Sequence, residues 1–165
     1  GNNNAWCQDN EIGWIDWTLT EKNADFLRFV REMIALRKRH SALRRPAFFR
    51  GRGPTGEFEP DIVWHGLEPR RADFGPTSRT VAFAIDGSQT GGEPDRDFYI
   101  ACNARADPVL FRVPASPSGR PWRRVVDTAL ASPQDILPEE EGPRVAANRI
   151  YPVAPFALVV LITDA

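Results

Sequence analysis

The sequence predicts a mainly β fold, in which an antiparallel β-sandwich follows one amphipathic helix. Three observations lead to this prediction. The first is a long segment with helical periodicity, and the second is a Gly- and Pro-rich interruption directly after it. The third is a series of seven short β-rich runs over the rest of the chain, a number typical of a two-sheet sandwich.

The helical signal covers residues 18–41. Thr18 and Glu21 have the spacing of a capping box at its start. Basic residues 37–40 suit its far end, because cations there interact with the backbone dipole by about 0.3–1 kcal/mol each. The alternative for this basic cluster is a polyanion-binding site. The apolar face predicted from three- and four-residue steps consists of Phe26, Phe29, Val30, Met33, Ile34 and Leu36.

Residues 46–57 hold two prolines and three glycines, a density that marks a linker. The predicted division is therefore 1–45, 46–57 and a sandwich domain at 58–165. The last β-rich run is continuously apolar, which indicates a central strand buried on both faces. The acidic stretch 133–143, with Glu139–Glu141, is predicted to be a solvated loop. The β-rich runs are 62–64, 80–85, 98–102, 109–113, 122–126, 149–153 and 156–162.

Composition narrows the classes of partner. With 42% hydrophobic residues the chain can bury a core, and its 21 basic and 22 acidic residues nearly cancel. We therefore expect neither nucleic acid nor a membrane as a partner, and no apolar run approaches the roughly 20 residues of a bilayer span. Cys7 and Cys102 do not make a disulfide framework, which favours a reducing compartment. His40 and His65 lack ligand spacing, so no metal site is predicted.

The first seventeen residues combine asparagine, acidic and tryptophan side chains. Amides and carboxylates pair with sugar hydroxyls, and indole rings offer flat apolar faces, so this segment is predicted to bind a sugar. The alternative is that the polar side chains bond to the loop's own backbone. The candidate substrate-binding residues are Asn3, Asn4, Trp6, Gln8, Asp9 and Asn10.

The same segment carries three motifs in a fixed order: Gly-Asn-Asn-Asn-Ala at 1–5, Cys-Gln-Asp-Asn at 7–10 and Trp-Ile-Asp-Trp at 14–17. It resembles the end of the catalytic barrel in bacterial glycogen-debranching enzymes and isoamylases of the α-amylase superfamily. Shorter stretches that are similar to these enzymes lie at 36–43, 61–66, 103–104 and 122–128. The resemblance implies that residues 1–45 are the last loop and helix of a truncated (β/α)8 barrel. Residues 58–165 would then be the carboxyl-terminal sandwich.

The resemblance also implies a function for the complete protein, the hydrolysis of α-1,6 branch linkages in glycogen or related α-glucans with retention, without a cofactor, in the bacterial cytoplasm. Retaining hydrolysis needs two carboxylates about 5–5.5 Å apart. In the family these lie on barrel strands that precede the Gly1 motif, so we expect no catalytic residue in this chain. Asp16 is instead expected to accept an indole N–H or to cap the helix. The implied partners are an α-glucan and the missing catalytic barrel.

Two other functions remain open. One is a non-catalytic carbohydrate-binding or accessory module, and the other is an enzyme acting on a different α-glucan linkage. For the module, the candidate sugar-stacking residues are Trp64, His65, Trp122 and Tyr151. Large aromatic residues in strands usually face the core, and we expect Trp64 and Trp122 to be buried.

Overall fold

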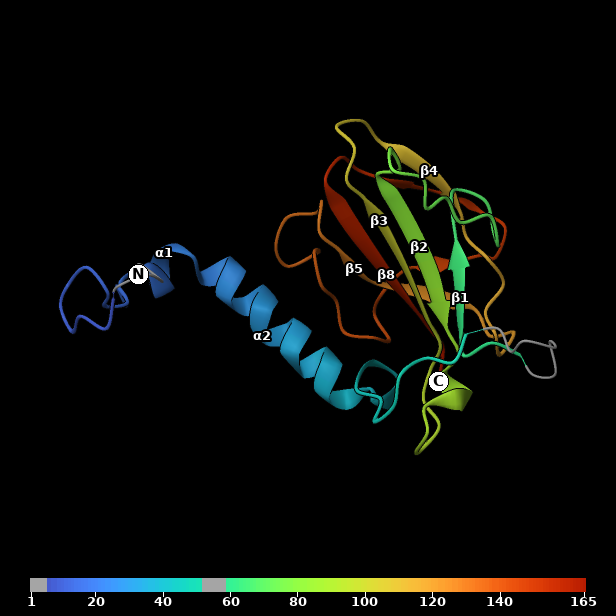
Figure 1. Ribbon diagram of the computed structural model, residues 1–165, viewed down its shortest axis with the longest axis horizontal. Coiled ribbons are helices and arrows are strands. Elements are labelled where there is room, and N and C mark those ends of the chain that lie inside the picture. The colour runs from blue at the N-terminus through green and yellow to red at the C-terminus, as the bar shows by residue number, and fades with distance from the viewer. Residues whose placement is uncertain (1–5, 52–58) are drawn as a thin grey trace.

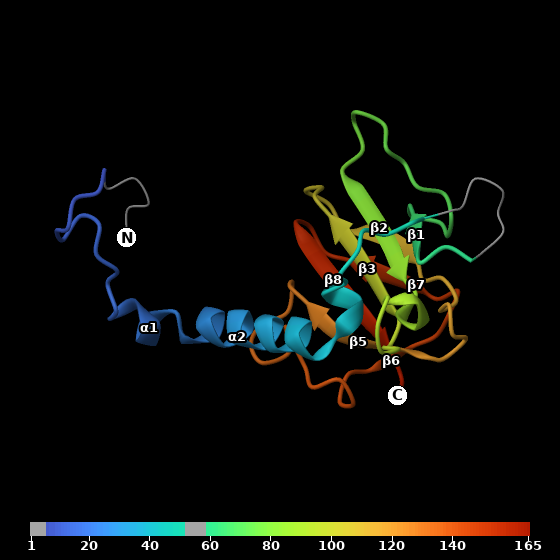
Figure 2. The ribbon, with the colours of Figure 1, turned by 60° about the horizontal axis from the view of Figure 1, so that its bottom comes forward.

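The fold is a two-sheet antiparallel sandwich with one long helix against the outside of the larger sheet, in a computed structural model that describes residues 6–51 and 59–165 (Figures 1 and 2). All seven predicted β-rich runs are strands, which confirms the mainly β fold class. The sequence missed β6, whose two residues are too few to show a pattern. The strands are β1 Ile62–His65, β2 Thr80–Ile85, β3 Phe98–Asn103, β4 Val109–Arg112, β5 Trp122–Asp127, β6 Arg144–Val145, β7 Ile150–Val153 and β8 Ala157–Thr163.

The predicted helix is present but divided. A short helix α1, Leu19–Lys22, is followed by α2, Ala24–Arg39, and two 3-10 turns lie at Ser41–Leu43 and Gly87–Gln89. The predicted capping box is wrong, because Thr18 makes no side-chain bond to the helix. Its hydroxyl instead donates to Asp16 Oδ1 over 2.6 Å.

The larger sheet has six strands in the order β1-β2-β3-β8-β5-β6, and the smaller sheet pairs β4 with β7. Strand β8 lies between β3 and β5, which confirms the prediction that the closing strand is central. Because side chains alternate along a strand, β8 sends residues to both faces of the sheet. Val159 and Leu161 enter the core between the two sheets, and Val160 and Ile162 enter a second core on the outer face.

Helix α2 contributes buried Leu36 to this outer core, and half-buried Phe29 and Met33 pack against it. Leu36 is 3% exposed and clusters with Phe98 and Ile162 of the sheet, and Ala42 in the following turn joins them. The beginning of the helix projects beyond the sheet, where Phe26 is 69% exposed (Figure 1). The division at 46–57 stays a prediction, but the outer core contains residues from both sides of it.

A buried ion pair also crosses that division. Arg45 Nη2 donates to Asp61 Oδ2 over 2.6 Å, and the backbone N–H groups of Arg50 and Gly51 donate to the same carboxylate. The Asp61 side chain is fully buried. Burial alone would favour its protonated form, but the two backbone N–H groups and the Arg45 charge hold its pKa below the usual range.

We expect Asp61→Asn to destabilise the fold by about 2–3 kcal/mol near neutral pH, because hydrogen bonds to a charged group are the stronger kind and Arg45 stays buried. A carboxylate with a lowered pKa stabilises the fold above its unfolded value and loses that contribution as pH falls. The difference between wild type and variant should therefore shrink below about pH 4. Urea denaturation of wild type and variant at a series of pH values measures both the loss of stability near neutral pH and its decrease at low pH.

The control for that experiment is Asp107→Asn, because the ion pair of Asp107 with Arg105 is solvent-exposed. This variant should change stability by less than about 1 kcal/mol. If the two variants lost the same amount of stability, the buried Arg45–Asp61 pair would not be what holds the segment before β1 against the sheet.

Candidate functional site

The amino-terminal segment lies beyond α1, away from both sheets (Figure 1). Asn3 and Asn4 fall outside the described residues. Trp6, Gln8 and Asp9 are exposed and Asn10 is half-buried. The substrate-binding role of all six candidates stays a prediction.

The described polar side chains of this segment make internal contacts. Asp9 Oδ1 accepts the indole N–H of Trp14 over 2.6 Å, and Asn10 Oδ1 accepts the backbone N–H of Ile12 over 3.1 Å. Asp16 accepts from the hydroxyl and backbone N–H of Thr18, and these bonds lower the pKa of its carboxyl. These are the loop-stabilising roles that were the alternative to sugar binding. They leave the indole faces open.

Those open faces make the segment strongly apolar on its surface. Trp6 is 79% exposed, Trp14 59% and Trp17 72%, with Ile12 and Ile15 similarly exposed. Side chains of this size are seldom left in water together unless they meet a partner. The segment therefore has the character of an interaction surface.

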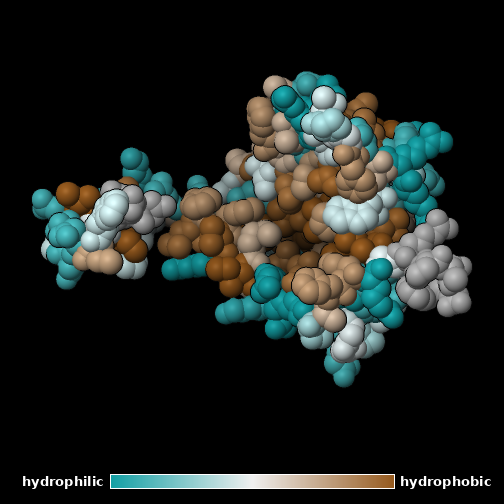
Figure 3. All heavy atoms as spheres, in the orientation of Figure 1, coloured by the Kyte–Doolittle hydropathy of each residue, from teal (hydrophilic) through white to brown (hydrophobic). Residues whose placement is uncertain are grey.

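A second apolar surface lies on the outer face of the larger sheet, and we call it the outer hollow. Its floor consists of half-buried Phe83, Ile100 and Leu158, beside the core that α2 covers. Trp64 stands at its edge, 44% exposed, with its ring 5.2 Å from Phe83 and 5.7 Å from exposed Phe74. Figure 3 shows a brown depression here and apolar surface continuing toward α2.

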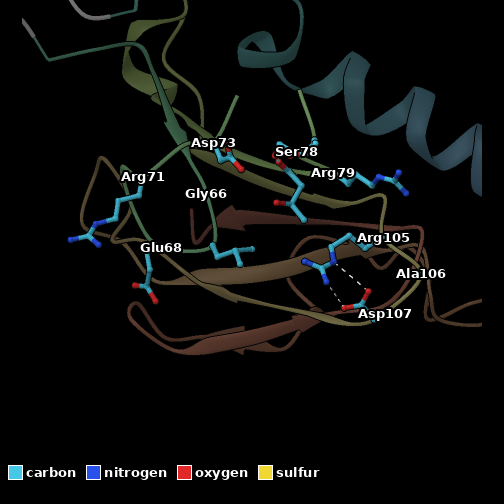
Figure 4. A pocket seen from close by; sticks show the side chains of 12 residues that line it. Gly66, Glu68, Arg71, Asp73, Ser78, Arg79, Arg105, Ala106 and Asp107 are labelled. Atoms are coloured by element: carbon cyan, nitrogen blue, oxygen red, sulfur yellow. Dashed lines mark hydrogen bonds and ion pairs between the residues drawn. The ribbon is translucent and has the colours of Figure 1, made fainter. Parts of the chain in front are cut away.

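A pocket of about 610 Å³ lies at one end of the sandwich, between the loop that follows β1 and the turn after β3 (Figure 4). Its acids are engaged: Asp107 pairs with Arg105, and Glu68 pairs with Arg112 over 2.8 Å. Asp73 accepts a backbone N–H within its own turn. The acids that line the pocket are therefore each bonded to a neighbouring group, and the pocket does not present two unpaired carboxylates for hydrolysis.

The aromatic residues singled out by the sequence have different surroundings. Trp122 is buried at 1% exposure, as predicted, but the prediction that Trp64 is buried is wrong. Tyr151 donates its hydroxyl to Asp127 over 3.0 Å, and burial followed by the Asp127 charge raises its pKa to about 12. Trp64 is the member of this set with a ring face open to solvent.

His65 is a structural residue in the described chain. It is buried, its Nδ1 accepts the backbone N–H of Arg70 over 2.9 Å, and its ring meets Tyr99 edge to face. Burial, assisted by the Arg70 charge, lowers its pKa to about 4, so the ring is neutral near pH 7. Residues 6–51 and 59–165 contain no group of three His, Cys, Asp or Glu side chains placed to hold a metal ion.

The acidic stretch is where the sequence misjudged the chemistry. Glu140 and Glu141 are exposed, as predicted, and Glu140 makes a surface ion pair with Arg96. Glu139, however, is half-buried and contacts Arg39, His40 and Arg96. The sequence did contain one indication of these contacts, the basic run at the end of α2, because clustered cations are stabilised by nearby carboxylates. No local pattern says which acids, about 100 residues away, supply them.

The comparison with known proteins agrees with this architecture. A family model described as "Isoamylase 1-3, C-terminal" matches residues 63–161, from β1 to β8. The chain belongs to the isoamylase family. The predicted family is thereby confirmed, and within it the matched residues correspond to the carboxyl-terminal domain of isoamylases.

Individual relatives extend the match beyond the sandwich. The "Glycogen operon protein GlgX homolog" of Mycobacterium tuberculosis is 37% identical over 140 residues, covering 78% of this chain and 19% of the relative. "Isoamylase 1, chloroplastic" of Oryza sativa subsp. japonica is 30% identical over 170 residues, covering 98% and 19%. The chain thus spans about a fifth of the length of these isoamylase-family relatives.

A solved structure supports the fold. The crystal structure of pullulanase type I from Bacillus subtilis, complexed with maltose, superimposes with a TM-score of 0.57 at 18% identity. The superposition covers 93% of this chain and 18% of the pullulanase. The described residues of this isoamylase-family chain include no helix with both the length and the apolar character needed to cross a bilayer.

Proposed function

We propose that this chain is the carboxyl-terminal portion of a glycogen-debranching glycoside hydrolase of the isoamylase type. The complete protein would hydrolyse α-1,6 branch linkages of glycogen or related α-glucans with retention, in the cytoplasm. The chain itself supplies no catalytic carboxylate. Its membership in the isoamylase family and the glycogen operon name of one relative support this proposal.

The observation that carries the proposal is the apolar surface left open on the outer face. The outer hollow and the exposed face of α2 form one region, and a protein rarely exposes an apolar patch of that kind without a partner. We assign this region, together with the exposed Trp14 and Trp17, to contact with the catalytic barrel. In this assignment residues 1–45 are the end of that barrel, and the sandwich is its non-catalytic support.

In the complete enzyme, the first loop would follow the last barrel strand and face the substrate, since barrel active sites lie at the carboxyl ends of the strands. Asn3, Asn4, Trp6, Gln8, Asp9 and Asn10 would then contact the α-glucan. The double displacement would use a nucleophile and an acid/base contributed by preceding strands. A parent that acts on a different α-glucan linkage would use the same arrangement.

We expect the purified chain to release no reducing ends from glycogen or its limit dextrin, because it lacks the two carboxylates of a retaining hydrolase. A reducing-sugar assay over long incubation measures this. Asp9→Asn and Glu11→Gln are the matched controls. Activity in the wild type that disappears in either variant would make the first loop catalytic and overturn the proposal.

One observation favours the accessory-module function, namely the open ring of Trp64 beside Phe74. Affinity electrophoresis in glycogen gels separates the two functions. The proposed scaffold should migrate alike with and without glycogen. Retardation of the wild type that is lost in folded Trp64→Ala would promote the binding module to first place.

A further inference from the structure

His40 stands at the joint between the long helix and the sandwich. It is the first residue after α2, it is 5% exposed, and its ring meets Phe98 of β3 edge to face at 5.0 Å. The residues of the joint therefore come from the helix end and from the sheet. A change in the charge of His40 therefore affects the contact between the end of α2 and the larger sheet.

Each ring nitrogen of His40 faces a carboxylate. Nδ1 lies 2.7 Å from Asp95 Oδ1, and Nε2 lies 3.2 Å from Glu139 Oε1. Asp95 precedes β3, and Glu139 lies in the loop between β5 and β6. The Nδ1 contact is a hydrogen bond, whereas the Nε2 contact is within ion-pair distance but lacks hydrogen-bond alignment. A neutral imidazole has one N–H and one lone pair, so only the protonated ring has an N–H on both nitrogens and a positive charge beside both carboxylates. A neutral ring would place a lone pair against a carboxylate oxygen.

Asp95 also holds the turn that follows the helix. Its second oxygen, Oδ2, accepts the backbone N–H of Ala42 over 2.9 Å, and Ala42 belongs to the outer core. The same carboxylate thus binds His40 and the residue that seats the turn on the sheet. Losing the His40 contact would therefore also weaken the hydrogen bond from the Ala42 backbone to Asp95, which holds the turn on the sheet.

The surrounding charges balance only when His40 is protonated. Arg39 Nε lies 2.9 Å from Glu139 Oε1, and Arg96 lies 3.7 Å from Glu139 and 2.6 Å from Glu140. Counting Asp95, the cluster has three anions against the two guanidinium groups. The imidazolium is the third cation. Arg39 and Glu140 are more than half exposed, but the side chains of His40, Asp95 and Glu139 are at most 15% exposed. Deprotonation therefore leaves the two buried carboxylates without the cation between them, which is unfavourable.

We propose that protonated His40 is a pH-sensitive clasp that fixes the carboxyl end of α2 on the sandwich and releases it as pH rises. In the complete enzyme the clasp would set how firmly the segment preceding the sandwich is held. The clasp depends on the carboxylates of Asp95 and Glu139. It does not depend on which glucan linkage the enzyme attacks.

The electrostatic balance agrees with the geometry. Burial by itself would lower the pKa of His40, but the hydrogen bond and charge of Asp95, followed by those of Glu139, outweigh burial and raise it. A group whose folded pKa is raised stabilises the fold fully below its unfolded value, about 6.5 for histidine, and loses that contribution as pH rises through the folded value. Each pKa unit of elevation makes the coupling about tenfold stronger.

The chain has only two histidines, which makes the clasp directly measurable. In an NMR titration of the imidazole Hε1 resonances, one histidine should titrate above about 6.5 and the other well below it. His40→Gln should remove the higher titration, and His65→Gln the lower one. A wild-type His40 resonance that titrates at or below the ordinary value would overturn the clasp.

Hydrogen exchange tests whether the proton holds the helix. Protection of the last turns of α2, corrected for intrinsic rates, should fall about tenfold or more between about pH 6 and about pH 9. Protection of β8 should fall much less. His40→Gln should show low helix protection at both pH values, and unchanged wild-type protection across the titration would overturn the clasp.

Two further variants keep the proposal testable if His40→Gln does not fold. Glu139→Gln retains the Asp95 contact but removes one anion, so the His40 titration and the loss of helix protection should both move to lower pH. Glu141→Gln is the matched control, because it changes an acid of the same loop that is exposed. If Glu139→Gln titrates like Glu141→Gln, Glu139 does not hold the proton and the clasp fails.

Discussion

Deleting residues 1–45 is expected to abolish cooperative unfolding of the sandwich, whereas deleting residues 1–17 should leave its melting transition nearly unchanged. The longer deletion removes Leu36 and Ala42 from the outer core and takes Arg45 from the buried carboxylate of Asp61. The shorter deletion removes residues that are almost all exposed where the structure describes them. Thermal melts followed by circular dichroism compare the two truncations with the complete chain.

The magnitudes decide between these outcomes. Removing a buried leucine side chain costs about 2–5 kcal/mol, and leaving a buried charge without its partner costs about 3–5 kcal/mol. Together these approach the whole stability of an ordinary domain, about 5–15 kcal/mol. If the truncation at residue 45 still melted cooperatively near the temperature of the complete chain, residues 58–165 would be an independent domain, as the sequence alone predicts.

That difference shows what the sequence can and cannot predict. Strand positions were predicted well because β-rich composition and turn residues are local signals, and β8 was recognised as central from its unbroken apolar run. The partners of α2 are not local. His40 meets Asp95 and Glu139, which lie 55 and about 100 residues further along the chain, and no spacing rule connects them. The Gly- and Pro-rich composition of residues 46–57 therefore predicted a boundary between domains, but side chains from both sides of it pack together in the outer core.

The candidate site shows the same limit. The residue types of the first loop fit sugar binding and hydrogen bonding within the loop equally well. In the described part of the segment, Asp9 and Asn10 make hydrogen bonds to other residues of the same loop. Trp64 was expected in the core from its strand position, but it lies on the outer face of the edge strand β1, where neighbours cover only part of its ring. Which face of a sheet remains open depends on what packs on it.

The two tryptophans of the sandwich test this distinction most sharply. We expect Trp122→Ala to destabilise the fold by about 4–5 kcal/mol, because truncating a large core aromatic removes buried area and leaves a cavity. Trp122 is 1% exposed, its ring lies 6.2 Å from that of Tyr99, and its indole N–H donates to the carbonyl of Pro114 over 2.8 Å. The truncation also leaves that buried carbonyl without its donor.

Trp64→Ala is the matched comparison, because the same truncation is made on the same sheet at a ring that is 44% exposed. It should cost no more than about 2 kcal/mol, because the Trp64 side chain buries less apolar surface in the folded chain than the Trp122 side chain does. Urea denaturation followed by circular dichroism gives both values, and Trp122→Phe, which keeps most of the apolar volume but loses the N–H, should fall between them. If Trp64→Ala cost as much as Trp122→Ala, the outer hollow would already be a closed core. The assignment of that face to the catalytic barrel would then be lost.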